Sequence, residues 1–365
     1  MSEELLLDDI ARTRDITKDP AALSLELVNE LQNRFKCNDD GIFVSGAQGY
    51  WSNLSREDNR RLLENLKTLP SRVAIARTYP YLEKVIYSPK RAAGLELLNL
   101  TGTEVCIDYG CMWGALTLPL AQRCHFVLGI DQTLESLMFL KARAIESDCK
   151  NIALVKHDIR LLPVLNYKAD VAVVNGVLEW IPENGTVELP SFYHRYGKRS
   201  YQGNPREQQK AFLRRVCDNL KAGGKLYLAI ENRYDAFSFF GAPDPHTRLL
   251  FTSFAPRLLA NIISQIRLGR PYVNWLYSFR ALERLVRECG FSLIEPFMCF
   301  PDYRFPERIL PLTGCLRTFN PTISKTNAKG ELSLKRRFAR GLEFVAFRLL
   351  QLRRLAPSII LIAEK

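Results

Sequence analysis

The chain has 365 residues, of which 47% are hydrophobic and 25% are charged, so it can bury a large core and is neither disordered nor fibrous. Its formal charge of +12 favours acidic partners such as nucleic acid, an anionic membrane surface or phosphate-bearing molecules. The nine cysteines are scattered and form no C-x-x-C pair, so we expect neither a disulfide framework nor a metal site. With no signal-peptide pattern and no apolar run near the roughly 20 residues of a membrane span, we expect a cytoplasmic protein.

The first part of the chain, residues 1–95, is predicted to be a helical extension. The run Ser55-Arg56-Glu57-Asp58 has the form of a capping box, which predicts a helix starting there. No regular alternation of strands and helices is visible in this part. We therefore expect it to pack on, or cover, the domain that follows.

The pattern changes in residues 96–300, where we expect the core domain. Apolar runs of strand length recur with helical stretches between them, and each run is nearly continuous in hydrophobicity, as in strands buried on both faces of a parallel sheet. The runs lie at 105–110, 125–131, 152–158, 169–176 and 225–232. This alternation predicts a doubly wound α/β sheet with right-handed crossovers, closed by a last strand within 356–365.

Two segments interrupt the alternation. Residues 183–205 are rich in tyrosine and arginine and include His194, which lies where it could touch a substrate. Residues 301–355 form a second insertion, whose end, 334–355, combines arginine with large apolar residues. Such a helix can lie on an anionic bilayer, or it can pack its apolar side on the core and present arginine to water. Both interpretations stay open, and we keep peripheral contact with the inner membrane face as an expectation.

Candidate ligand-binding residues follow the predicted strands, because ligands of open parallel sheets bind beyond the carboxyl ends of the strands. Glycines there permit a tight turn and close approach of a ligand. A carboxylate after the second strand can accept hydrogen bonds from a ribose diol, and one after the third can accept from an adenine amine while an apolar neighbour stacks on the ring. Helix capping and simple chain turning are the alternative for any one motif. In chain order these residues are Asp108, Gly110, Gly114, Asp131, Asp158, Ile159 and Asn175.

The ordered set resembles the class I S-adenosylmethionine-dependent methyltransferases over about 105–300, together with the closing strand. That family begins with D/E-x-G-x-G-x-G, which Asp108, Gly110 and Gly114 match, while Met112 stands where the middle glycine is usual. The run 220–225 is similar to the family's turn before strand five. A nicotinamide-binding domain would instead need G-x-G-x-x-G, which this turn does not supply.

The resemblance implies a Rossmann-like sheet of strand order 3-2-1-4-5-7-6 and S-adenosylmethionine as cofactor. It also implies that Asp131 holds the ribose, that Asp158 contacts adenine with Ile159 beside it, and that Asn175 lies near the methionine part.

Methyl transfer to an oxygen requires removal of the hydroxyl proton, so a base is expected near the ends of strands four and five. The acidic candidates are Glu179 and Glu231. The loop after strand five contains His246, whose side chain titrates near neutrality, and Asp244, which we expect to orient it. Our hypothesis is that His246 is the general base, and a surface or structural histidine is the alternative.

A narrower resemblance, over about 170–312, concerns the acceptor. It is similar to bacterial methyltransferases associated with surface polysaccharide and lipopolysaccharide synthesis, which implies a sugar hydroxyl on a glycan or glycolipid precursor. Three alternatives stay open: methylation of a small-molecule hydroxyl, methylation of a nucleic acid, and a module that binds without turnover. The segment after the fourth strand lacks the N/D-P-P-Y/F motif that accompanies methylation of amino groups on bases. The oligomeric state is open too. The runs that carry this resemblance are 231–233, 244–247, 277–280, 289–291, 301–303 and Pro306.

Overall fold

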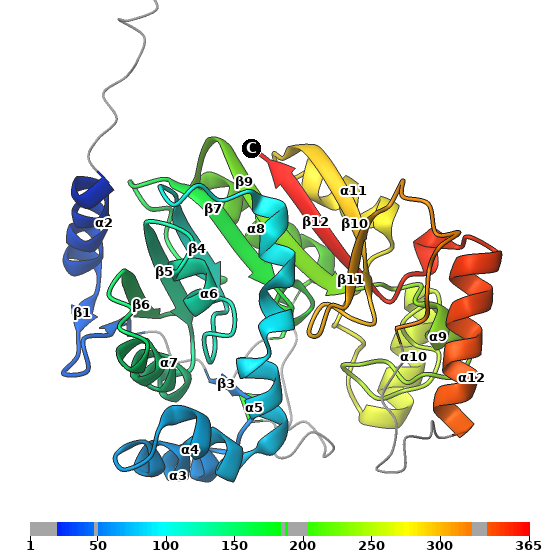
Figure 1. Ribbon diagram of the computed structural model, residues 1–365, viewed down its shortest axis with the longest axis horizontal. Coiled ribbons are helices and arrows are strands. Elements are labelled where there is room, and N and C mark those ends of the chain that lie inside the picture. The colour runs from blue at the N-terminus through cyan, green and yellow to red at the C-terminus, as the bar shows by residue number, and fades with distance from the viewer. Residues whose placement is uncertain (1–19, 47–49, 184–186, 189–202, 323–333) are drawn as a thin grey trace, which may run out of the picture.

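The computed structural model describes residues 20–46, 50–183, 187–188, 203–322 and 334–365. Within them a ten-stranded mixed sheet is flanked by helices on both faces (Figure 1). A second, small sheet pairs β3 (Trp51–Ser52) with β8 (Val187–Glu188). The strands of the large sheet are β1 (Lys36–Cys37), β2 (Phe43–Val44), β4 (Val105–Tyr109), β5 (Phe126–Asp131), β6 (Ile152–Lys156), β7 (Ala169–Asn175), β9 (Leu220–Glu231), β10 (Ser292–Phe300), β11 (Arg308–Pro311) and β12 (Ser358–Glu364).

The central strands run in the order β6-β5-β4-β7-β9-β12-β10, which confirms the predicted order 3-2-1-4-5-7-6. The first five of these strands are parallel, whereas β12 inserts antiparallel between β9 and β10. At the edges, β2 pairs parallel with β6 and β11 pairs antiparallel with β10. The region expected to be helical thus also contributes β1, β2 and β3, because strands of two residues leave no periodic signal in a sequence.

The predicted helices form around this sheet, and Ser55 caps α3 by accepting the backbone N–H of Asp58 at 3.0 Å. The described part of the chain has no helix long and apolar enough to cross a bilayer. The helices are α2 (Pro20–Arg34), α3 (Arg56–Leu66), α4 (Ser71–Thr78), α5 (Pro80–Tyr87), α6 (Thr117–Ala121), α7 (Leu134–Glu146), α8 (Pro205–Asp218), α9 (Ala236–Phe239), α10 (Arg257–Leu268), α11 (Phe279–Arg287) and α12 (Leu334–Glu343). Tighter or wider turns form η1 (Pro89–Leu98), η2 (Leu178–Trp180), η3 (Phe344–Leu349, a π-helix) and η4 (Arg353–Leu355).

Successive strand residues point to opposite sides of the sheet, and both sides are covered by other segments of the chain, so the sheet is buried on both faces. On one face Ile107 and Tyr109 pack with α2, α8 and α11. On the other face Cys106 and Val173 pack with η1 and the segment around α6. This double packing fixes the strands, so the carboxyl ends of β4, β5, β7 and β9 lie along one edge of the core.

Two expectations need comment. Residues 220–225, predicted as a turn, already belong to β9, where Gly223 has a φ of 73° and the pairing with β7 shifts register between Ala169 and Val171. The bulge lets a bent strand stay paired where a separate turn was expected. His194 and most of the insertion 183–205 lie outside the described residues.

Candidate active site

A cavity of about 770 Å³ lies at the carboxyl ends of the central strands. Beside residues from β4, β5 and β7, its lining includes side chains of α5 and of the loop after β10. Gly114 and Glu179 do not line it. The predicted residues that do are Asp108, Gly110, Asp131, Asp158, Ile159, Asn175, Glu231 and His246.

At the end of β5, Asp131 is held in a fixed orientation. Its carboxylate accepts the backbone N–H of Met112 at 3.0 Å and that of Thr133 at 2.8 Å. Burial raises the pKa of Asp131 to about 6, although these hydrogen bonds act in the opposite direction. A carboxylate oxygen can accept more than one hydrogen bond, so Asp131 can also accept from the hydroxyls of a ribose.

The Gly-rich turn after β4 has the conformation that its glycines suggested. Gly110 and Gly114 both have a φ of 74°, and Met112 shares the left-handed region at 42°. A Cβ on Gly110 would come within 2.6 Å of Val177 Cγ2, whereas one on Gly114 would collide with Leu140 of α7. Gly110 therefore shapes the cavity, while Gly114 lets α7 pack closely against the turn.

Beneath this turn, Asp108 is buried and accepts a hydrogen bond from Thr117 Oγ1 at 2.7 Å. Burial raises the pKa of Asp108 to about 6. The carboxylate thus ties the turn to the start of α6, and it also borders the cavity.

The residues after β6 and β7 complete the cofactor end. Burial alone would raise the pKa of Asp158, but Arg160, whose Nε lies 2.9 Å from Oδ1, holds it below its ordinary value. Ile159 lies beside it on the cavity wall. Within the described chain, Asn175 Oδ1 is buried without a hydrogen-bond partner. A buried orphan acceptor is costly, so a bound donor at this position would remove a penalty. The amino group of S-adenosylmethionine is such a donor.

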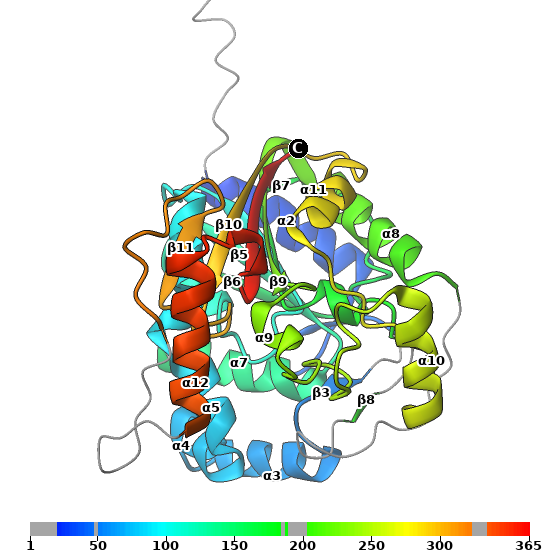
Figure 2. The same ribbon diagram turned by 90° about the vertical axis from the view of Figure 1, so that its right-hand side faces the viewer.

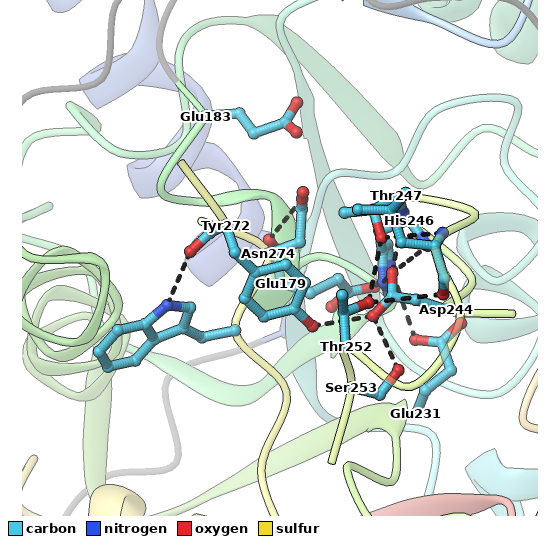
Figure 3. Close-up of polar contacts among 12 residues, drawn as sticks. Glu179, Glu183, Glu231, Asp244, His246, Thr247, Thr252, Ser253, Tyr272 and Asn274 are labelled. Atoms are coloured by element: carbon cyan, nitrogen blue, oxygen red, sulfur yellow. Dashed lines mark hydrogen bonds and ion pairs between the residues drawn. The ribbon is translucent and has the colours of Figure 1, made fainter. Parts of the chain in front are cut away.

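The three predicted catalytic side chains come together at the other end of the cavity (Figure 3). His246 Nε2 lies 3.6 Å from Glu179 Oε1 and 3.7 Å from Glu231 Oε2. Glu231 ends β9, Glu179 lies in η2 just after β7, and His246 lies in the loop after α9. Polar atoms of all three lie within 4.8 Å of one another, a spacing that serves a proton acceptor and would also admit one cation.

Burial and charge act against each other in this cluster. Desolvation would lower the pKa of His246, but the carboxylates of Glu231 and Glu179 outweigh it and raise the pKa to about 9. Glu179 is fully buried, and desolvation raises its pKa, with a further contribution from Glu231. His246 therefore holds a proton at neutral pH. Once it has lost this proton, its imidazole is a stronger base than an ordinary histidine, because its pKa is higher.

Asp244 orients His246 differently from the expectation. The ring nitrogen Nδ1 is 4.0 Å from Asp244 Oδ1, which is too long for a hydrogen bond. The carboxylate instead accepts the backbone N–H of His246 at 2.9 Å and that of Thr247 at 2.8 Å, as well as the hydroxyls of Ser253 and Tyr272 at 2.8 Å each. Asp244 thus positions His246 through the loop backbone (Figure 3).

Several aromatic residues that are not among the candidate site residues also line the cavity. The rings of Trp180 and His246 meet edge to face with centroids 4.9 Å apart, and the Tyr303 hydroxyl donates to Glu231 Oε1 at 3.3 Å. Trp51 and Tyr81 reach the cavity from the N-terminal extension. Tyr303 belonged to a run already singled out at 301–303, but nothing in the sequence indicates that Trp51 or Tyr81 would reach β7 and β9.

Comparisons with known proteins agree with the geometry at the cofactor end. The model of a family described as "Methyltransferase domain" matches residues 100–250. A "Probable cobalt-precorrin-6B C(15)-methyltransferase (decarboxylating)" of Methanocaldococcus jannaschii is 33% identical over 66 residues, which cover 18% of this chain and 36% of that protein. A protein of the same name from Methanococcus vannielii is 27% identical over 86 residues, covering 24% and 47%. The matches thus span about a third to a half of these curated relatives.

Two solved structures are similar to this chain at low sequence identity. Phosphoethanolamine N-methyltransferase 2 of Haemonchus contortus, in complex with S-adenosyl-L-methionine, is 13% identical with a TM-score of 0.43 and covers 82% of this chain and 60% of that one. The YcgJ protein of Bacillus subtilis is 11% identical with a TM-score of 0.39 and covers 76% and 97%.

The family match includes β4, β5, β6 and β7, whose carboxyl ends build the cofactor half of the cavity. Residues 100–250 therefore match a methyltransferase domain, and the cofactor of this domain is S-adenosylmethionine.

Proposed function

We propose that the protein methylates a hydroxyl oxygen, and that this hydroxyl belongs to a sugar unit of a glycan or glycolipid precursor. The observation that carries the proposal is the cluster of His246, Glu179 and Glu231 in and beside the cavity that holds the cofactor residues. The thioether that leaves when a sulfonium gives up its methyl group needs no acid catalyst. The attacking hydroxyl, in contrast, must lose its proton, which requires a base. A buried base at this place serves oxygen methylation.

S-adenosylmethionine supplies the methyl group, so the S–CH₃ bond breaks as the O–CH₃ bond forms. His246 Nε2 takes the hydroxyl proton, and the two carboxylates stabilise the resulting imidazolium. Tyr303, through its hydrogen bond to Glu231 Oε1, limits the rotation of that carboxylate. The buried position of the cluster keeps bulk water from competing with the acceptor.

The sugar assignment rests on the acceptor end of the cavity. Aromatic rings of Trp180 and Tyr303 offer flat apolar surfaces, and the carboxylate of Glu231 lies beside them. Pockets of this kind, largely apolar with a few placed polar groups, fix the orientation of small polar ligands. The rings suit the apolar face of a sugar, and the carboxylate suits its hydroxyl groups. Glu231, His246 and Tyr303, which line the cavity, each belong to a run that resembles the polysaccharide-associated enzymes.

The proposal is tested by incubating the protein and labelled S-adenosylmethionine with glycolipid, soluble-glycan, small-metabolite and nucleic-acid fractions of cell extract. We expect label in a carbohydrate fraction, as an ether methyl that survives mild base. Label on a small metabolite or a nucleic acid would replace the acceptor assignment, and release of no S-adenosylhomocysteine with any fraction would contradict turnover altogether.

The same assay separates the two roles open to His246. Chelation by EDTA should leave turnover unchanged if His246 works as a proton acceptor. Loss of turnover in EDTA, restored by added Mg²⁺ or Mn²⁺, would show that the cluster holds a cation instead.

A further inference from the structure

Exposed apolar side chains are concentrated on one side of the molecule. Of the 22 exposed large hydrophobic residues in the described chain, fifteen lie in two segments, 236–270 and 334–355. Their exposure is high, at 76% for Ile266, 74% for Leu258 and 62% for Phe338. Soluble monomers rarely leave so many large apolar side chains together in water, so this side is expected to be covered by something.

The two segments form one surface, which we call the α9–α10–α12 face. Figure 2 shows α12 and α10 on the side turned to the viewer, with α9 and its loop between them. Phe240, just after α9, meets Phe338 of α12 with ring centroids 6.2 Å apart. Phe239 stacks on Phe254, and Phe251 meets Phe254 edge to face in the same loop region. These ring contacts connect α12 with the end of α9 and join the aromatic residues of the loop that leads to α10.

The charge of this face has a single sign. In the sequence the two segments carry eleven Lys and Arg, of which Arg270 is buried and does not belong to the face, against two Asp and Glu. Both acidic residues, Asp244 and Glu343, are buried. Arg248, Arg267 and Arg348 are exposed among the apolar side chains. An apolar surface that carries exposed cations, and whose two described segments expose no acidic side chain, is complementary to an anionic bilayer.

The face also borders the cavity. Arg267 and Leu268, at the end of α10, line the same cavity as His246, and so do Arg248 and Leu249. A molecule entering from this side would meet the face before the reaction centre.

We propose that the α9–α10–α12 face docks the protein on the surface of an anionic membrane, with the cavity entrance turned toward the lipid. The face lies in the interface and does not span it. Ile262, Ile266 and Phe338 enter the boundary between headgroups and acyl chains, while the exposed arginines pair with lipid phosphates. The step from docking to a lipid-linked acceptor rests on the proposed function, but the docking itself does not.

The experiment measures binding of the full chain to vesicles by co-sedimentation, without any acceptor. Vesicles of phosphatidylcholine are compared with vesicles in which about one third is phosphatidylglycerol, an anionic lipid. We expect partitioning onto the anionic vesicles that weakens with added salt. The double variant Ile262→Glu with Ile266→Glu should bind at least tenfold more weakly. Ile145→Glu, at an equally exposed position on α7, should bind as the unchanged protein does.

A second pair isolates the charge. Arg340→Gln with Arg348→Gln should lower binding by about fivefold per arginine and flatten its dependence on salt. Unchanged calorimetric affinity for S-adenosylmethionine in each variant shows that the fold is intact.

Three outcomes would overturn the proposal. The first is no partitioning onto anionic vesicles, and the second is equal loss of binding in Ile145→Glu. The third is a stable dimer in solution that the α10 substitutions dissociate, because the face would then bind a second copy of the chain. None of these outcomes depends on methyl transfer, so failure here and failure of the proposed function are distinguishable.

Discussion

The two ends of the cavity are built in different ways. The cofactor end uses residues at, or just after, the carboxyl ends of β4, β5, β6 and β7, so neighbouring strands bring them together. The acceptor end draws Glu179, Glu231, His246 and Tyr303 from segments that are separated along the chain and joined only by the folded loops. A shared fold can therefore keep one end constant while the other end varies in its loops.

Removal of the proposed base, His246, should have the largest effect and should act on the acceptor end of the cavity alone. His246→Ala should lower kcat by roughly 10²- to 10⁴-fold, since that is the usual contribution of a general base. Affinity for S-adenosylmethionine should stay within twofold by calorimetry, because His246 lies at the other end of the cavity. His125→Ala, in a histidine that precedes β5 at the opposite edge of the sheet, is the matched control and should leave kcat unchanged. Equal turnover in both variants would remove His246 from the chemistry.

The cofactor end is broken by a change at Asp131. Asp131→Ala should weaken S-adenosylmethionine binding by about tenfold or more, because one hydrogen bond to a charged group is worth roughly 1.5–3 kcal/mol. Isothermal calorimetry measures the affinity, and a thermal melt checks that loss of the bonds from Met112 and Thr133 has not unfolded the domain. Asp170→Asn, at the start of β7 and away from the cavity, serves as the control. Unaltered affinity in Asp131→Ala would contradict the ribose assignment.

The electrostatic coupling within the acceptor end is tested by pH. With the pKa of His246 raised to about 9, the neutral imidazole accumulates only as pH rises, so log kcat should climb toward pH 9 and then level off. Glu231→Gln removes a negative charge that favours the imidazolium, so the inflection should move to lower pH. Glu288→Gln, an exposed carboxylate remote from the cavity, should not move it. A wild-type profile that is flat between pH 6 and pH 9 would contradict proton removal by His246.

The sequence predicted the cofactor end of the cavity more completely than the acceptor end, and the reason is physical. Strand order and the cofactor residues follow from continuous apolar runs and from the residues that end them, both of which are local properties. Glu179, Glu231 and His246 were named from the same logic, but their mutual spacing required the fold. Trp51 and Tyr81 could not be predicted, since their contact with the cavity depends on how the N-terminal extension packs. Asp244 shows where sequence-based prediction ends. The sequence places Asp244 close to His246, but it does not indicate that the carboxylate accepts the backbone N–H of His246 rather than a ring N–H.

The smallest expected effect concerns Met112, which replaces the glycine usual at this place in the resembled family. Its φ of 42° is unfavourable for a residue with a Cβ, at a cost of roughly 1–2 kcal/mol. Met112→Gly relieves this cost but adds freedom to the unfolded chain, so the free energy of unfolding should change by less than about 1 kcal/mol. Because the backbone N–H that binds Asp131 is retained, S-adenosylmethionine affinity should stay within threefold by calorimetry. A tenfold gain in affinity would mean that the methionine side chain obstructs the cofactor. A tenfold loss would mean that this side chain packs against the cofactor. In either case the side chain of the turn, and not its backbone alone, would determine the affinity for the cofactor.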